Sequence, residues 1–430
     1  MSIKKKLGKI PKSINKEELI DLTKRLYSQI NQISPDGEWQ PFSQNRIWSI
    51  KMTNRDKYIF HLNHDANLYL EKAIKLIKSD PMYIDDVSVK RIKNKYMDLI
   101  IKIIKSNVDS DQEINNMVDC FISELKTSIK KYRILMPIEK LELTDLDEVK
   151  IGNVRFVPFS SLKAENEELS KVVDVEDENK IWGDVIIKAE LAEAELKGQH
   201  EIERAINTLR IYIPLIYKDK LNIKIGFFKC DNRSYKYFII DDCSSINRSI
   251  KYLGPFGNYI LSKEKYDDLK TKYCLDEICG MLSKAPENRS DLENSIIMAI
   301  RWLGLGMDDE VVSDKFLKYA IALECLLITR GEKGDKTGPI SKRAAFILGT
   351  TASECKSIES KVKLLYNIRS VIVHQGCEAE EEKIIKDSVQ TMYWYSMNSL
   401  LELSKKTIGP DSWEDIGYLD KQIDEQTFAR

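Results

Sequence analysis

The sequence predicts a mainly helical protein with an α+β middle domain, and three patterns support this fold class. Apolar residues recur at helical spacing through the first third of the chain. From about residue 135, short alternating runs indicate strands, and from about residue 286, long helical segments with short connections indicate an up-and-down bundle. We therefore expect a helical N-terminal domain at 1–134, an α+β middle domain at 135–285, a helical bundle at 286–405 and a tail at 406–430.

Composition and targeting signals narrow the class of protein. The 430 residues are 43% hydrophobic and 31% charged, as in ordinary globular proteins. The formal net charge is −1, so any nucleic-acid site must be a local basic patch rather than a global field. No apolar run is long enough to cross a bilayer, and the N-terminus lacks the apolar core of a signal peptide. We expect a cytoplasmic protein without membrane contact.

The cysteines and histidines offer few metal ligands. The eight cysteines form no CxxC pair, which predicts reduced thiols and no zinc site. His61 and His64 lie three residues apart, and on a helix they could present two ligands to a metal ion. No third ligand is obvious nearby, which favours structural or surface histidines. We expect no cofactor and no metal ion, and an enzyme in the N-terminal domain would have only this pair to support it.

The individual elements follow from local patterns of spacing and turn residues. In the N-terminal domain we expect helices at 17–33, 66–79, 86–106 and 112–132, with a strand pair within 47–62. In the middle domain we expect two strands within 149–157, an exposed acidic connection at 163–179, a strand at 182–190, a helix at 192–217 and a hairpin of 221–228 with 235–240. In the C-terminal domain we expect a helix at 287–303 that is interrupted at Gly304 to Gly306, then helices at 313–329, 339–348, 358–375 and 379–405.

The fourth of these C-terminal helices carries one residue that does not fit its apolar stripe. Val362, Leu365, Ile368 and Ile372 fall on one side at helical spacing, and Arg369 lies inside this stripe, between Leu365 and Ile372. A guanidinium keeps its proton in a protein interior, so Arg369 requires an acidic partner, an anionic ligand or another subunit. His374 follows five residues later, rotated by about 140° around the helix axis.

These residues carry a resemblance to a known family. Arg369-Ser-Val-Ile-Val-His374 fits the Arg-x4–6-His signature of HEPN domains, and the surrounding chain at about 290–405 resembles the Apea-like HEPN branch. The segments that carry this likeness are Arg301-Trp302 with the Gly-rich break, Phe316 to Glu324, Ile340 to Leu348 and Leu365 to His374. The resemblance implies a HEPN-type helical bundle that cleaves RNA without a metal ion, leaves a 2′,3′-cyclic phosphate and a 5′-hydroxyl, and forms a composite site across a homodimer. It also implies a role in phage defence by abortive infection, or as a toxin.

The residue types suit this chemistry. Metal-free cleavage of RNA needs a base for the 2′-hydroxyl proton, a fixed cation for the charge on the phosphorane and an acid for the 5′-oxygen. His374 can supply the base or the acid, and Arg369 the cation. One helix cannot easily aim both side chains at one phosphate, whereas two copies related by a two-fold axis can. We therefore expect Arg369 and His374 to be catalytic in a homodimer, with Ser370, Asn367 and Glu324 supporting them. The expected partners are an RNA substrate such as tRNA and a phage-derived or cellular activator that acts on the N-terminal region.

Two alternatives remain open. In the first, the structural alternative, Arg369 pairs with Glu324 inside the bundle and His374 is a cation favoured by the helix C-terminus. In the second, the bundle is a non-catalytic RNA- or protein-binding module with a degenerate site. Ser370 favours the second, because Asn, Asp or His more often follows the arginine in HEPN motifs. Its hydroxyl lies four residues before His374 and could still hydrogen-bond the imidazole.

Overall fold

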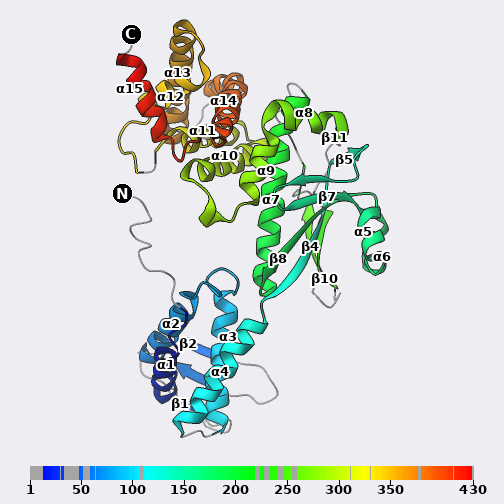
Figure 1. The fold of residues 1–430 in the computed structure, drawn as a ribbon, viewed down its shortest axis with the longest axis vertical. Coiled ribbons are helices and arrows are strands. Elements are labelled where there is room, and N and C mark those ends of the chain that lie inside the picture. The colour runs from blue at the N-terminus through cyan, green and yellow to red at the C-terminus, as the bar shows by residue number, and fades with distance from the viewer. Residues whose placement is uncertain are drawn as a thin grey trace. The chain divides into compact units, whose positions relative to one another are not determined.

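The computed structural model of the protein is mainly helical, which confirms the coarse fold class expected from the sequence (Figure 1). The structure describes residues 13–29, 31–32, 48–51, 59–62, 64–106, 110–217, 223, 225–226, 233–240, 246–253, 259–309, 311–329, 331–375, 379–409 and 411–428. Contacts divide the chain into two compact units. The first comprises Met1–Tyr132, Ile187–Lys197 and Asp241–Ser245, and the second comprises Arg133–Ile186, Gly198–Ile240 and Ile246–Arg430. Most of the middle region therefore shares a unit with the C-terminal helices.

Within its described residues, the first unit contains four helices and a small antiparallel sheet. The helices are α1 (Lys16–Gln29), α2 (His64–Lys78), α3 (Val89–Ser106) and α4 (Asp111–Thr127), and the sheet order is β1 (Asn31–Gln32), β3 (Ile59–Leu62) and β2 (Trp48–Lys51). The helices share a hydrophobic core in which the rings of Tyr96 and Phe121 lie 5.6 Å apart. The expected helices and strand pair are confirmed, except that the helix expected at 112–132 ends at Thr127 and residues 130–132 begin strand β4 (Lys130–Ile138). His61 lies in β3 and His64 begins α2, so the two are not presented by one helix.

The middle of the chain forms a six-stranded sheet. Its order is β10 (Ile246–Leu253), β9 (Arg233–Ile240), β4 (Lys130–Ile138), β8 (Ile181–Ala189), β7 (Val154–Pro158) and β6 (Val149–Ile151). The β6–β7 hairpin turns at Gly152, whose φ of 60° lies in the left-handed region that glycine tolerates. The long helix α7 (Leu191–Ile216) runs along the sheet (Figure 1). Gly198 permits this approach, because a Cβ there would lie 2.5 Å from Cγ1 of Ile134.

Two expectations for the middle region need correction. Most described side chains of the acidic stretch 163–179 are exposed as expected, but the stretch is not an irregular connection, because the chain here forms α5 (Phe159–Glu165), α6 (Leu169–Val172) and a 3-10 helix (Val175–Asp177). Leu169 of this stretch and Leu162 just before it pack with Trp182 in a buried cluster, which the acidic composition did not indicate. The hairpin partner of β9 is β10 rather than 221–228, because β9 lies between β10 and β4 in the sheet. Most of 221–228 lies outside the described residues.

The C-terminal helices pack on one another around α11. Strands β5 (Leu141–Thr144) and β11 (Tyr259–Ser262) pair in parallel, and the helices that follow are α8 (Lys263–Tyr273), α9 (Leu275–Ser283), α10 (Asp291–Asp308), α11 (Val312–Leu327), α12 (Thr337–Leu348), α13 (Ala352–Gln375), α14 (Ala379–Lys405) and α15 (Gly417–Phe428). Helix α11 contacts α10, α12, α13 and α14. The expected helices at 313–329, 339–348, 358–375 and 379–405 are confirmed. Part of the expected tail forms α15, which the buried side chains of Ile416 and Leu419 anchor.

Helix α10 continues through Gly304 and Gly306, so the expected break at these glycines was wrong. Both glycines are points of close contact between helices. A Cβ at Gly304 would lie 2.5 Å from Cβ of Asn207 in α7, and a Cβ at Gly306 would lie 2.4 Å from Cε1 of Tyr319 in α11. The glycines therefore allow two neighbouring helices to approach α10.

Replacing Gly306 with alanine should destabilise the protein by about 1–3 kcal/mol, because the new methyl group would displace the buried ring of Tyr319. Gly280→Ala is the matched control. It adds a methyl group to α9 with no atom within 4 Å, and it should stabilise the protein by about 0.5–1 kcal/mol. Urea unfolding followed by circular dichroism measures both changes. Equal stabilities of the two variants would contradict the packing role of Gly306.

Candidate functional site

The residues expected to be catalytic lie in the C-terminal half of α13. Leu365 and Ile372 are buried, so the apolar stripe of α13 faces the bundle as expected. Tyr366 is buried beside this stripe, and its hydroxyl donates a hydrogen bond of 3.2 Å to the carbonyl oxygen of Ala320 in α11. This packing holds α13 at one rotation about its axis. It leaves the side chain of Arg369 30% exposed at the border of the stripe.

Glu324 of α11 is the acidic partner of Arg369. Its Oε1 lies 3.2 Å from Nη2 of Arg369, and its side chain is 14% exposed. Its other oxygen, Oε2, lies 3.4 Å from Nζ of Lys336, the residue that precedes α12. The ion pair of the structural alternative is therefore formed within one chain. The carboxylate of Glu324 thus forms ion pairs with both Arg369 and Lys336.

The guanidinium of Arg369 is poorly satisfied by this pair. Its Nε is buried from solvent and has no hydrogen-bond partner. Arg343 of α12, in the same bundle, has a hydrogen-bond acceptor for each of its three guanidinium nitrogens. Its Nε and Nη2 lie 2.8 and 2.7 Å from the carboxylate oxygens of Asp420, and its Nη1 donates to the Leu327 carbonyl oxygen at 2.7 Å. A buried donor without a partner destabilises the fold by about 1–3 kcal/mol, so the surroundings of Arg369 are not optimised for stability.

His374 lies in the last turn of α13 and is exposed, as are Ser370 and Asn367. A cation at this end of a helix is favoured by the helix dipole. Among the described residues, neither Ser370 nor Asn367 hydrogen-bonds the imidazole, so the orienting contacts expected from the sequence are not formed within one chain. The side chains of Arg369 and His374 leave α13 about 140° apart, as helix geometry requires.

An apolar groove of about 190 Å³ lies between α13 and α14, next to these residues. It is lined by Asn367, Ile368, Val371, Ile372, Ile384 and Ile385. Ile385 is buried, whereas its neighbour Ile384 is 56% exposed, and Leu364 and Val373 of α13 are exposed as well. Sequence reasoning missed this groove, because apolar side chains on a predicted bundle helix were assigned to its core.

Cys325 follows Glu324 in α11 but is not a nucleophile at neutral pH. Burial, together with the nearby charge of Glu324, raises the pKa of the Cys325 thiol to about 11. The thiolate is the reactive form of cysteine, so this thiol is inert under ordinary conditions. The reactive groups of the candidate site are therefore the guanidinium and the imidazole.

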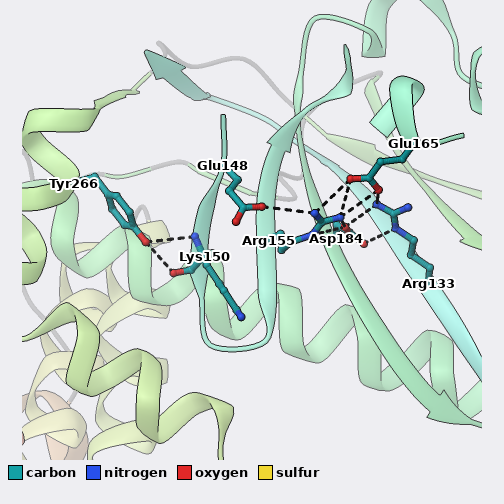
Figure 2. A network of polar contacts seen from close by, with 7 residues as sticks. All are labelled: Arg133, Glu148, Lys150, Arg155, Glu165, Asp184 and Tyr266. Carbon is teal, nitrogen blue, oxygen red and sulfur yellow. Dashed lines mark hydrogen bonds and ion pairs between the residues drawn. The ribbon is translucent and has the colours of Figure 1, made fainter. Parts of the chain in front are cut away.

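A second cluster of charged side chains lies on the six-stranded sheet (Figure 2). Asp184 of β8 is 2% exposed and pairs with two arginines: its Oδ1 lies 2.9 Å from Nε of Arg133 in β4, and its Oδ2 lies 2.9 Å from Nε of Arg155 in β7. Glu165 of α5 contacts both guanidinium groups, and Glu148 lies 3.6 Å from Arg155. Burial lowers the pKa of Arg133, but the hydrogen bonds to its carboxylate partners outweigh burial and the net shift is upward.

This cluster links helix α5 to the sheet through ion pairs. Its arginines and carboxylates satisfy one another, and together they hold α5 to three strands of the sheet. In the same view, the hydroxyl of Tyr266 in α8 donates to the carbonyl oxygen of Lys150 at 3.1 Å (Figure 2). Burial raises the pKa of Tyr266 to about 12, so this hydroxyl remains a donor at neutral pH. Sequence reasoning missed both contacts, because the partners lie far apart in the chain.

Asp184→Ala should destabilise the protein by about 3–5 kcal/mol, because it leaves two arginines without their buried carboxylate. Glu148→Ala removes a carboxylate at the exposed edge of the same cluster, 3.6 Å from Arg155, and should change stability by less than about 1 kcal/mol. Urea unfolding of both variants measures the difference. A loss below about 1 kcal/mol in the free energy of unfolding of Asp184→Ala would contradict the stabilising role of these buried ion pairs.

No protein-family model, curated protein or solved structure matched the chain. The likeness of residues 290–405 to Apea-like HEPN domains therefore stays a prediction that rests on the segments quoted above. In the part of the chain that the structure describes, no helix is both long and apolar enough to cross a membrane. In that same part, no group of three or more His, Cys, Asp or Glu side chains is placed to hold a metal ion. The candidate site is thus defined by its own geometry: Arg369 and Glu324, with His374 at the end of the same helix.

Proposed function

We propose that the protein is a metal-independent endoribonuclease of HEPN type, with Arg369 and His374 as its catalytic residues. The observation that carries this proposal is the state of the Arg369 guanidinium. It lies at the border of an apolar stripe, contacts one carboxylate oxygen at 3.2 Å and has a buried Nε without a partner. Arg343 in the same bundle has an acceptor for each of its nitrogens, so an anionic ligand accounts for the open donor of Arg369 more fully than Glu324 alone.

The proposed reaction follows from the chemistry of these two side chains. The imidazole of His374 takes the proton of a ribose 2′-hydroxyl, and the 2′-oxygen attacks the adjacent phosphorus. Arg369 balances the negative charge that develops on the phosphorane oxygens. In the proposed homodimer, the His374 imidazole of the second copy protonates the departing 5′-oxygen, which leaves a 2′,3′-cyclic phosphate and a 5′-hydroxyl. This sequence of proton transfers requires no metal ion.

A homodimer is proposed because the two side chains point in different directions from one helix. A two-fold axis beside α13 would place the Arg369 of one copy near the His374 of the other. The apolar groove between α13 and α14, together with the exposed side chains of Leu364, Val373 and Ile384, supplies a surface that association would cover. Association through this surface would bury the exposed apolar side chains. It would also bring together Arg369 and His374, which point away from each other in one chain.

The biological setting is proposed from the family resemblance. Apea-like HEPN proteins act in abortive infection against phage, so we assign this chain a cytoplasmic defence or toxin role with RNA, such as tRNA, as substrate. The candidate site belongs to the second compact unit, and the N-terminal helices belong to the first. This division supports a regulatory role for the N-terminal region, on which a phage-derived or cellular activator would act.

A second candidate function is a non-catalytic HEPN module that binds RNA or protein. Two observations favour it. Glu324 already forms an ion pair with Arg369, and the His374 imidazole receives no orienting hydrogen bond from Ser370. Such a module would bind RNA in a salt-dependent manner without cutting it.

Cleavage of tRNA and bulk RNA by the full-length protein in EDTA tests the activity. Arg369→Ala and His374→Ala should each slow cleavage at least about 100-fold, because each removes a group that acts in the transition state. Lys361→Ala, which removes an exposed cation from the same helix, is the matched control and should leave the rate unchanged. Cleavage that persists in both site variants would refute the assignment, and a wild type that binds RNA without cutting it would favour the binding module.

Ile384→Asp should convert the dimer to a monomer and abolish cleavage, because a buried charge would face the partner copy at the groove. Val175→Asp adds the same charge at an exposed apolar side chain on the 3-10 helix and should leave the dimer intact. Light scattering coupled to size-exclusion chromatography measures the mass of each variant. A wild-type protein that stays monomeric at all concentrations would rule out the composite site.

A further inference from the structure

The carboxylate of Glu324 has more cationic partners than it can neutralise. Its two oxygens face Nη2 of Arg369 at 3.2 Å and Nζ of Lys336 at 3.4 Å. These three side chains alone carry a charge of about +1, from two cations and one carboxylate. A phosphate group is the ligand that such an arrangement favours.

The two other acids near Lys336 in the chain have hydrogen-bond partners other than Lys336, although Asp335 keeps its negative charge. Glu332 accepts a hydrogen bond from Nη1 of Arg343 at 2.8 Å. Asp335 accepts one of 3.0 Å from the backbone N–H of Thr337 at the start of α12, and this bond lowers the pKa of Asp335. Within the described residues, Lys336 therefore pairs only with the carboxylate that Arg369 also uses.

Lys336 is also poorly placed to stabilise α12. It occupies the N-cap position, where its side chain forms no capping hydrogen bond. Ser, Thr, Asp and Asn are favoured there, and a cation is opposed by the positive end of the helix dipole. Local helix stability does not account for a lysine at this position.

We propose that Lys336 binds the RNA backbone phosphate next to the one held by Arg369, and that it positions the strand for cleavage. This inference rests on the proposed ribonuclease function. The Lys336 side chain is 45% exposed on a flexible stem, so it can leave Glu324 and reach a ligand. Glu324 then pairs with Arg369 alone and keeps that guanidinium oriented. Lys336 is thus a positioning residue, and it does not take part in proton transfer.

Binding of a fluorescein-labelled single-stranded RNA to the full-length His374→Ala protein, measured at several KCl concentrations, tests the proposal without cleavage. Adding Lys336→Ala should weaken binding about fivefold at 0.1 M salt and reduce the slope of log K against log [KCl] by about 0.7, as expected for one lost phosphate contact. Lys333→Ala removes an exposed cation from the same loop and should leave the slope unchanged. Lys336→Arg should retain the slope. In the protein that keeps His374, Lys336→Ala should raise KM and change kcat by less than about twofold.

The outcomes separate this proposal from the function on which it rests. An unchanged slope in Lys336→Ala, or equal losses in Lys336→Ala and Lys333→Ala, overturns the specific phosphate contact even if the wild type cleaves RNA. A reduced slope together with a wild type that never cleaves supports the contact and refutes the ribonuclease. A parent protein that does not bind RNA at all overturns both.

Discussion

The position of Arg369 depends on how α13 packs in the C-terminal bundle, where it contacts α11, α12 and α14. The buried side chains of Leu365 and Ile372, and the hydrogen bond from Tyr366 to the backbone of α11, allow α13 only one rotation about its axis. At that rotation Arg369 lies at the border of the stripe, within reach of Glu324. The ion pair, the exposure of the imidazole five residues later and the opening of the groove toward α14 all follow from this one orientation of α13.

The chain uses arginine in two different ways. Arg133, Arg155 and Arg343 each spread their donors over two or more acceptors, as expected for charges that are removed from water and must be neutralised locally. Arg369 has a single carboxylate and a buried Nε with no acceptor. The contrast lies within one molecule, so it does not depend on a general standard for ion pairs. Arg91 also has a buried Nε without an acceptor, so what distinguishes Arg369 is its place at the border of the apolar stripe, on the same helix as His374.

Local sequence signals predicted the helices and the β6–β7 turn well, because helical spacing and the glycine at 152 depend on neighbours in the chain. They failed where contacts between distant segments decide the outcome. Gly304 and Gly306 read as a break, yet they permit close contact with α7 and α11. At the candidate site, a guanidinium in an apolar stripe was enough to anticipate Glu324, since the charge demanded a partner. The groove could not be foreseen, because Ile384 and Ile385 are adjacent in sequence and only packing decides which one is buried. The Asp184 cluster joins three strands and a helix, so no short segment contains its pattern.

The segment Ile187–Lys197 joins the end of β8 to the start of α7, yet it belongs to the first compact unit. There, Glu190 donates its backbone N–H to the carbonyl oxygen of Asp86 at 2.7 Å, and Nζ of Lys197 lies 2.7 Å from the carboxylate of Asp86. The polypeptide therefore passes between the units more than once. A fragment that began at residue 133 would carry this segment without its neighbours, so no single cleavage of the backbone yields two intact halves. A ligand that bound the N-terminal helices would therefore act on a unit that contains the first turns of α7, the long helix beside the sheet.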